Sequence, residues 1–141
     1  MTAKAGVPAA TAGQLSVNGV TFPLEDKWVL LPSEQDEIKV ATDAYNATIA
    51  AVAASKDLAL VDLNGILTQA STTGIKFDDY TLTTSLVTGG LVSLDGIHLT
   101  ARGYALMANK FLEAIDATYG SNFVASGNIA DAGEYPTNFS P

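Results

Sequence analysis

The fold class is decided by residues 33–62, SEQDEIKVATDAYNATIAAVAASKDLALVD. The stretch opens with Ser33-Glu-Gln-Asp36, a capping-box-like start whose acidic side chains suit the positive end of a helix dipole. Apolar residues then recur every three or four positions, which predicts a helix over about 34–56 with a core-facing stripe of Ile38, Ala41, Tyr45, Ile49 and Val52. The short apolar run Leu58-Ala-Leu-Val61 follows, ends in Asp62 and is typical of a buried parallel strand. A helix followed by such a strand predicts an α/β fold.

A second main helix is predicted over about 100–118. Thr100 is a suitable N-cap and Gly120 a suitable left-handed stop after the last turn. The buried face of this helix is expected to contain Tyr104, Ala108, Phe111, Leu112 and Ile115. Between the two helices we expect a short helix near 63–70, then weak strands and loops over 75–92.

The two ends of the sequence predict irregular chain. Residues 1–32 contain an Asn18-Gly19 turn signal and three prolines that interrupt any helix, Pro8, Pro23 and Pro32. Residues 121–141 are rich in Gly, Asn, Ser and Pro and read as a C-terminal tail. The predicted organisation is therefore an extended or irregular region at 1–32, a main α/β domain at 33–120 and a tail at 121–141.

Composition excludes several classes of function. Acidic residues outnumber basic ones 15 to 7 and give a net charge of −8, and the basic residues form no run. Nucleic acid and anionic membrane surfaces are therefore not expected as partners. No window approaches 18 consecutive apolar residues, so no membrane span is predicted. The chain contains no Cys and a single His, which removes thiolate chemistry and multi-histidine metal sites.

No cofactor or metal is predicted. The pair Asp78-Asp79 could ligate Ca²⁺ together with a loop carbonyl, but paired acids in a loop are more often simply solvated. Chemistry is thus left to carboxylates, hydroxyls and the one imidazole.

That imidazole lies in residues 93–100, SLDGIHLT, immediately before the second helix. Asp95 and His98 are three residues apart, and Gly96 permits a tight turn between them. In such a turn the carboxylate can accept a hydrogen bond from Nδ1–H, which leaves Nε2 free to act as a general base towards a hydroxyl. The alternative is a surface histidine beside a helix start, with Asp95 serving only as a cap.

Residues 95–109, DGIHLTARGYALMAN, resemble the last conserved block of the SGNH (GDSL) hydrolases. That block is Asp-x-x-His, usually followed by Pro-x-x-x-Gly-Tyr and an Ala-rich final helix. Upstream, Tyr45-Asn46 and residues 58–62 are similar to the long helix and to the strand before that block. Residues 24–35 also resemble an inserted region in a lipolytic subgroup of secreted bacterial proteins. The resemblance covers about residues 20–120 and implies the C-terminal part of a flavodoxin-like three-layer fold.

The resemblance implies that His98 is the base of a Ser-His-Asp triad and that Asp95 orients it. This sequence departs mildly at Leu99, where the family usually has Pro. It also lacks the Gly-Asp-Ser block of the nucleophile and the Gly-x-Asn-Asp block of the oxyanion hole. Ser93 is near in sequence, but the short loop would have to fold back to present its Oγ to Nε2, so Ser93 is not predicted as the nucleophile.

The implied function is therefore that of a C-terminal portion of a serine ester hydrolase, lipase- or esterase-like, whose substrate is an ester or lipid-like molecule. The chain alone is expected to be inactive and to self-associate through an exposed sheet edge. The resemblance also implies a secreted, periplasmic or cell-envelope bacterial protein. The alternative is a non-catalytic α/β binding or assembly module that retains the Asp95–His98 pair.

Overall fold

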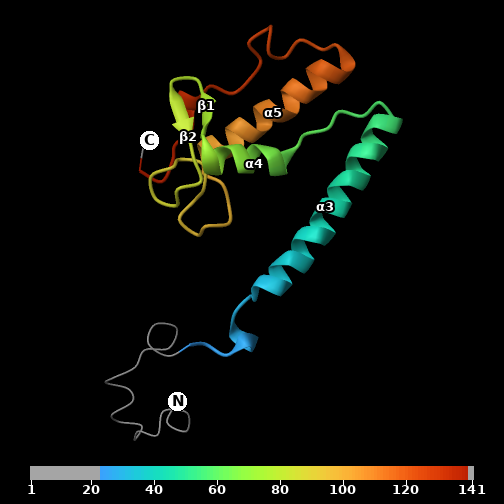
Figure 1. The fold of residues 1–141 in the computed structure, drawn as a ribbon. Helices are drawn as coiled ribbons and strands as arrows, with labels where there is room; N and C mark the ends of the chain where they lie inside the picture. Colours follow the sequence, from blue (N-terminus) through green and yellow to red (C-terminus); the bar gives the residue numbers. More distant parts are fainter. Residues whose placement is uncertain (1–22, 140–141) are drawn as a thin grey trace, which may run out of the picture. The chain divides into compact units, whose positions relative to one another are not determined.

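The computed structural model describes residues 23–139 (Figure 1), so the predicted Asn18-Gly19 turn lies outside the described residues. The chain divides between Thr48 and Ile49 into two compact units, each of which is described by itself. None of the helices between residues 23 and 139 is long and apolar enough to cross a bilayer.

The predicted long helix is present as α3 (Pro32–Ser55), preceded by the short 3-10 helix η1 (Asp26–Trp28). Its start lies slightly before the predicted position because Pro32 occupies the first turn, where a missing N–H costs no helical hydrogen bond. The carboxylate of Glu34 accepts a hydrogen bond from the backbone N–H of Leu31 at 2.8 Å. That bond is the carboxylate half of a capping box, and it lies two residues earlier than the predicted box of Ser33 and Asp36.

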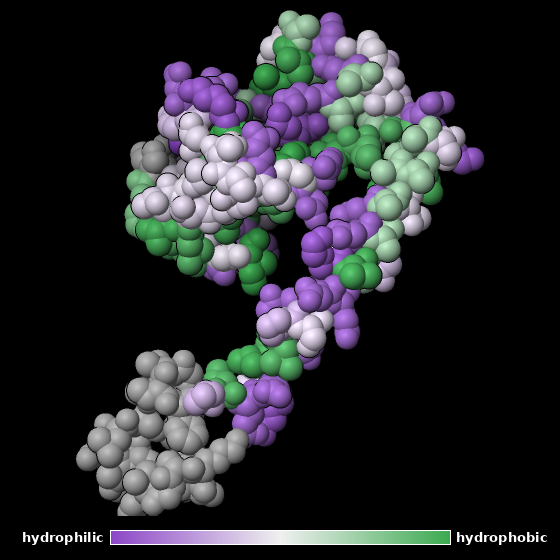
Figure 2. All heavy atoms as spheres, viewed as in Figure 1, coloured by the Kyte–Doolittle hydropathy of each residue, from purple (hydrophilic) through white to green (hydrophobic). Residues whose placement is uncertain are grey.

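The expectation that the apolar stripe of α3 belongs to a core is wrong for the described structure. The side chains of Tyr45, Ile49 and Val52 are 68%, 53% and 51% exposed, and Ala53 is the only buried residue of this helix. The sequence correctly predicts the helix itself, but not the burial of the stripe. Figure 2 shows hydrophobic side chains reaching the surface in the described part of the chain.

The parallel strand predicted at 58–61 is also absent. The segment has no regular secondary structure, and the N–H of Ala59 donates to the Tyr119 hydroxyl at 3.1 Å instead of to a neighbouring strand. A strand needs a partner edge, and the described residues form one sheet of two strands, which pair with each other and not with this segment.

That sheet is an antiparallel hairpin of β1 (Ile75–Phe77) and β2 (Tyr80–Leu82), with Ile75 opposite Leu82. Weak strands are confirmed in the 75–92 region, and the short helix near 63–70 is confirmed as α4 (Leu63–Thr72). The fold is therefore a mixture of helices and a small sheet, broadly α/β, but its sheet is antiparallel and not parallel.

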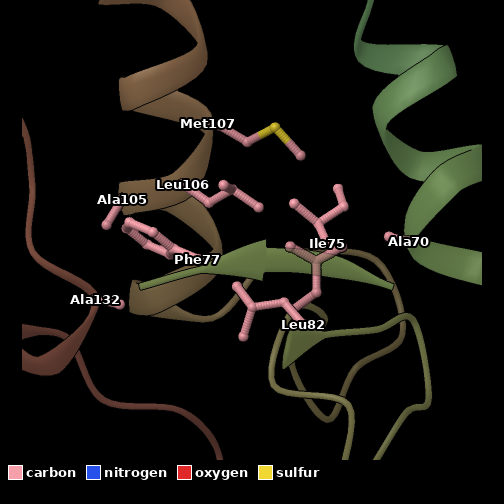
Figure 3. Close-up of a cluster of buried hydrophobic side chains, with 9 residues drawn as sticks. Ala70, Ile75, Phe77, Leu82, Ala105, Leu106, Met107 and Ala132 are labelled. Carbon is pink, nitrogen blue, oxygen red and sulfur yellow. The ribbon is translucent and has the colours of Figure 1, made fainter. Parts of the chain in front are cut away.

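The core of the second unit forms where the hairpin meets α5 (Ala101–Tyr119), the predicted second main helix. Figure 3 shows Leu106 and Met107 of α5 beside Ile75 and Phe77 of the hairpin. The segment after α5 returns to this core through the 3-10 helix η2 (Ala132–Glu134), and the Ala132 side chain is fully buried.

The buried face of α5 differs from the predicted one. Tyr104, Ala108 and Phe111 are exposed, and Leu112 and Ile115 are half-buried. The buried residues are Arg102, Gly103, Ala105, Leu106, Met107 and Asn109. Arg102 and Asn109 are buried because residues distant in the sequence provide main-chain partners: Arg102 Nε donates to the Tyr135 carbonyl, and Asn109 bonds both main-chain groups of Ala130.

Candidate functional site

The segment that carries the only histidine is a short closed loop. An antiparallel bridge joins Val92 to Leu99, and the Ser93 N–H donates to the His98 carbonyl at 2.8 Å. Inside the loop, the Gly96 N–H donates to the Ser93 carbonyl at 3.0 Å, and Gly96 has a φ of +74°. A side chain is strained at that backbone angle, so glycine suits the turn that brings Asp95 close to His98.

The start of α5 is fixed directly after this loop. Thr100 is the N-cap: its Oγ1 accepts from the Gly103 N–H at 2.9 Å and donates to the Gly90 carbonyl at 2.6 Å. A Cβ at Gly103 would lie 2.4 Å from the Leu91 carbonyl oxygen, so only glycine permits α5 to approach the main chain at Leu91 this closely. The Thr100 hydroxyl thereby ties the first turn of α5 to the main chain at Gly90.

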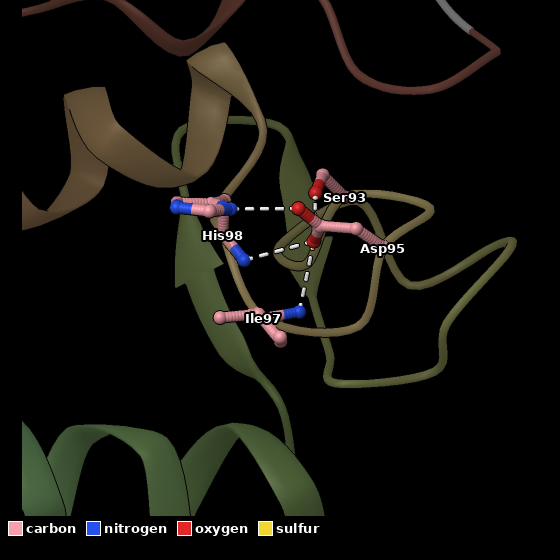
Figure 4. A network of polar contacts seen from close by, with 4 residues as sticks. All are labelled: Ser93, Asp95, Ile97 and His98. Atoms are coloured by element: carbon pink, nitrogen blue, oxygen red, sulfur yellow. Dashed lines mark hydrogen bonds and ion pairs between the residues drawn. The ribbon is translucent and has the colours of Figure 1, made fainter.

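Asp95 and His98 form a direct pair (Figure 4). Nδ1 of His98 lies 2.6 Å from Oδ2 of Asp95. The other carboxylate oxygen, Oδ1, accepts from the Ser93 hydroxyl at 2.7 Å and from the N–H groups of Ile97 and His98, each at 2.9 Å. These hydrogen bonds, the Ser93 hydroxyl first and the His98 ring second, hold the pKa of the Asp95 carboxyl well below its ordinary value of 3.8. An ionised carboxylate is an acceptor only, so the neutral imidazole is expected to carry its proton on Nδ1.

The geometry rejects the view of Asp95 as a simple helix cap, because Thr100 is the residue that caps α5. The His98 side chain is 70% exposed, and no group within residues 23–139 hydrogen-bonds its Nε2. Nε2 is therefore an open acceptor, which is the state that a general base requires.

Ser93 does not lie at that acceptor. Its hydroxyl donates to Asp95, on the carboxylate side of the pair, whereas Nε2 points away from it in Figure 4. No serine hydroxyl in the described part of the chain bonds Nε2. The arrangement can accept a proton at Nε2, but the described residues present no nucleophile to supply one.

In the other acidic candidate, Asp78-Asp79, the Asp78 side chain has a structural role. Asp78 lies in the tight turn between β1 and β2 and accepts from the Ala132 N–H at 2.7 Å, which ties η2 to the hairpin. No group of three or more His, Asp or Glu side chains within residues 23–139 is arranged to hold a metal ion.

A cavity of about 310 Å³ lies away from the histidine. Its lining comes from the segment between α3 and α4, from α4 and from α5: Leu60, Val61, Asp62, Ile66, Lys110, Glu113 and Ala114. Neither Asp95 nor His98 lines it.

Two features of the site were missed at the level of sequence. The role of the Ser93 hydroxyl on Asp95 had a signal, because a serine two residues before an aspartate can close a local side-chain turn. The burial of Arg102 had no such signal in the sequence. Its side chain is only 2% exposed and lies 3.8 Å from the centre of the Tyr80 ring, and its partners Tyr80 and Tyr135 are distant in the sequence.

Comparisons with family models, with curated proteins and with solved structures found no match for this chain.

Proposed function

We propose that this chain is the C-terminal portion of a serine ester hydrolase, in which His98 is the general base and Asp95 orients it. The observation that carries the proposal is the 2.6 Å contact between Asp95 Oδ2 and His98 Nδ1, with Nε2 left open to solvent. An imidazole held by a carboxylate in this way can take the proton of a hydroxyl as that hydroxyl attacks an ester carbonyl.

The nucleophile and the oxyanion donors belong, on this proposal, to protein sequence outside these 141 residues. The sequence contains neither Gly-Asp-Ser nor Gly-x-Asn-Asp, and the Ser93 hydroxyl donates its hydrogen bond to Asp95. The substrate class is an ester or lipid-like molecule, as the resemblance to the SGNH hydrolases implies, within a flavodoxin-like domain exported from a bacterial cell.

The test begins with the coding sequence upstream of Met1. An in-frame Gly-Asp-Ser block there supports the proposal, and the longer protein is then assayed with p-nitrophenyl butyrate. His98→Ala is expected to lower kcat/KM by about 10³-fold or more, since the members of a triad act as a unit. The matched control is Ser71→Ala, because the Ser71 hydroxyl bonds only the Thr68 carbonyl on exposed α4. An upstream sequence without such a block, or full activity in His98→Ala, would overturn the proposal.

The second candidate is a non-catalytic binding or assembly module, favoured by the exposed apolar side chains of α3 and of the 58–61 segment. A module of this kind would bind a partner equally well before and after His98→Ala, and its longer form would hydrolyse no ester. Ester hydrolysis that is lost in His98→Ala and kept in Ser71→Ala therefore indicates the hydrolase, and the absence of any hydrolysis indicates the binding module.

A further inference from the structure

The hydrogen bonds of the histidine loop converge on Ser93. Its N–H donates to the His98 carbonyl at 2.8 Å, its carbonyl accepts from the Gly96 N–H at 3.0 Å, and its hydroxyl donates to Asp95 Oδ1 at 2.7 Å. The two main-chain bonds close the loop and would be made by any residue with an N–H. Only the third bond depends on the serine side chain.

The two oxygens of the Asp95 carboxylate have different hydrogen-bond partners. Oδ1 of Asp95 accepts from Ser93 and from two backbone N–H groups, while Oδ2 contacts the His98 ring alone. The backbone donors lie on the C-terminal side of Asp95, and Ser93 is the one donor from its N-terminal side. The hydroxyl therefore fixes the carboxylate from the side that the backbone leaves unsupported.

We propose that Ser93 is a positioning residue, whose hydroxyl holds the Asp95 carboxylate so that Oδ2 faces Nδ1 of His98 and Nε2 stays unprotonated. The hydroxyl touches neither Nε2 nor the space in front of it, so it acts only through Asp95. The catalytic meaning of this role rests on the proposed function, but the positioning itself is a property of these 141 residues and is measured without any substrate.

The chain contains a matched control for this interaction. At the end of α5, the Ser121 hydroxyl donates to Asp116 Oδ1 at 2.6 Å, and the N–H groups of Phe123 and Val124 also donate to that carboxylate. As with Asp95, the serine hydroxyl is the main cause that lowers the pKa of the Asp116 carboxyl. No imidazole contacts Asp116 among the described residues, so Ser121→Ala removes the same kind of bond away from His98.

The experiment measures the tautomer of His98 by ¹⁵N NMR at a pH where its ring is neutral, which is unambiguous because the sequence has one histidine. The parent chain and Ser121→Ala are expected to show mainly the Nδ1–H form. In Ser93→Ala the ratio of Nδ1–H to Nε2–H should fall about 3- to 10-fold, because one charge-assisted hydrogen bond at an exposed site is lost. Ser93→Thr, which keeps a hydroxyl, should restore the ratio.

Two results would overturn the positioning role: an unchanged tautomer ratio in folded Ser93→Ala, or an equal loss in Ser121→Ala. If Ser93→Ala fails to fold by circular dichroism, Ser93→Cys decides, because a thiol fills the site but donates only weakly. A parent-like ratio in Ser93→Cys rejects the proposal, and a reduced ratio supports it. None of these measurements requires hydrolysis. The positioning role of Ser93 can therefore be confirmed or rejected even if the hydrolase proposal fails.

Discussion

At the scale of single residues, the charge of Asp95 decides which nitrogen of His98 is available. The carboxylate accepts at both oxygens and offers no proton, so the ring facing it keeps hydrogen on Nδ1. An amide at this position would supply donors as well, and it would permit the opposite tautomer. The side-chain charge thus matters more here than the shape.

Asp95→Asn is therefore expected to reduce the nucleophilicity of Nε2. Carbethoxylation of the single histidine by diethyl pyrocarbonate, followed by absorbance near 240 nm, should slow by about tenfold or more, because less of the ring exposes an unprotonated Nε2. Asp79→Asn, which makes the same charge change in the hairpin turn, should leave the rate unaltered. Equal rates for the parent chain and Asp95→Asn would contradict the orienting role.

The low pKa of the Asp95 carboxyl sets the direction of a pH effect. Because its pKa in the folded chain is lower than the ordinary 3.8, its hydrogen bonds contribute stability that is fully present above about that pH. The contribution is lost only as the pH falls through the lowered value. In a ¹³C NMR titration, the Asp95 carboxyl should have its midpoint below 3.8. A midpoint at or above 3.8 would mean that the loop does not hold the carboxylate as described.

At the scale of elements, the loop and α5 depend on the glycine at their junction. Alanine normally stabilises a helix relative to glycine by up to about 1 kcal/mol. At Gly103 the sign should reverse, because the added Cβ would lie 2.4 Å from a backbone oxygen that cannot rotate away.

Gly103→Ala is expected to lower the free energy of unfolding by about 1–3 kcal/mol, the range for overpacking a close contact. Urea denaturation followed by circular dichroism measures the effect. Gly120→Ala is the control: a Cβ there meets nothing within 4 Å, so its cost is only that of a left-handed backbone, about 1–2 kcal/mol. The two variants also differ at the site, because only Gly103→Ala should broaden the NMR signals of His98. A Gly103→Ala chain as stable as the parent would reject this account of the junction.

The positions of the helices could be predicted from local interactions in the sequence, whereas the residues that they pack against could not. Thr100 and Gly120 predict the two ends of α5 because a hydroxyl cap and a left-handed stop are local interactions. The local turn at Asp95 and His98 was predictable for the same reason. The buried face of α5 was not, because the bonds that bury Arg102 and Asn109 come from main chain 33 and 21 residues away. The strand expected at 58–61 failed likewise, since an apolar run specifies an edge but not the presence of a partner.

At the scale of the whole molecule, the proposed base, His98, has no serine hydroxyl at its Nε2 among residues 23–139. Fluorophosphonates label serines whose hydroxyl is deprotonated by a neighbouring base, and no described serine hydroxyl lies at Nε2 of His98. The 141-residue chain is therefore expected to give no stoichiometric adduct in intact-mass spectrometry and no burst with a p-nitrophenyl ester. A commercial serine hydrolase labelled in parallel is the positive control. A stoichiometric adduct on any serine of this chain would show that the nucleophile is present after all.

The exposed apolar side chains lead us to expect that the chain associates at high concentration. Leu58 and Leu60 are 51% and 44% exposed on a segment that pairs with neither strand of the described sheet, a combination that favours association with another chain. The net charge of −8 opposes association, and salt screens that repulsion. Sedimentation velocity should therefore show a weight-average mass that rises with protein concentration and with ionic strength. Leu60→Ser is expected to weaken the association, whereas Leu94→Ser, an equally apolar change at an exposed loop position, should not. A monomer of constant mass across concentration and salt would contradict this expectation, and the exposed segment would then have to be tolerated in water without a covering partner.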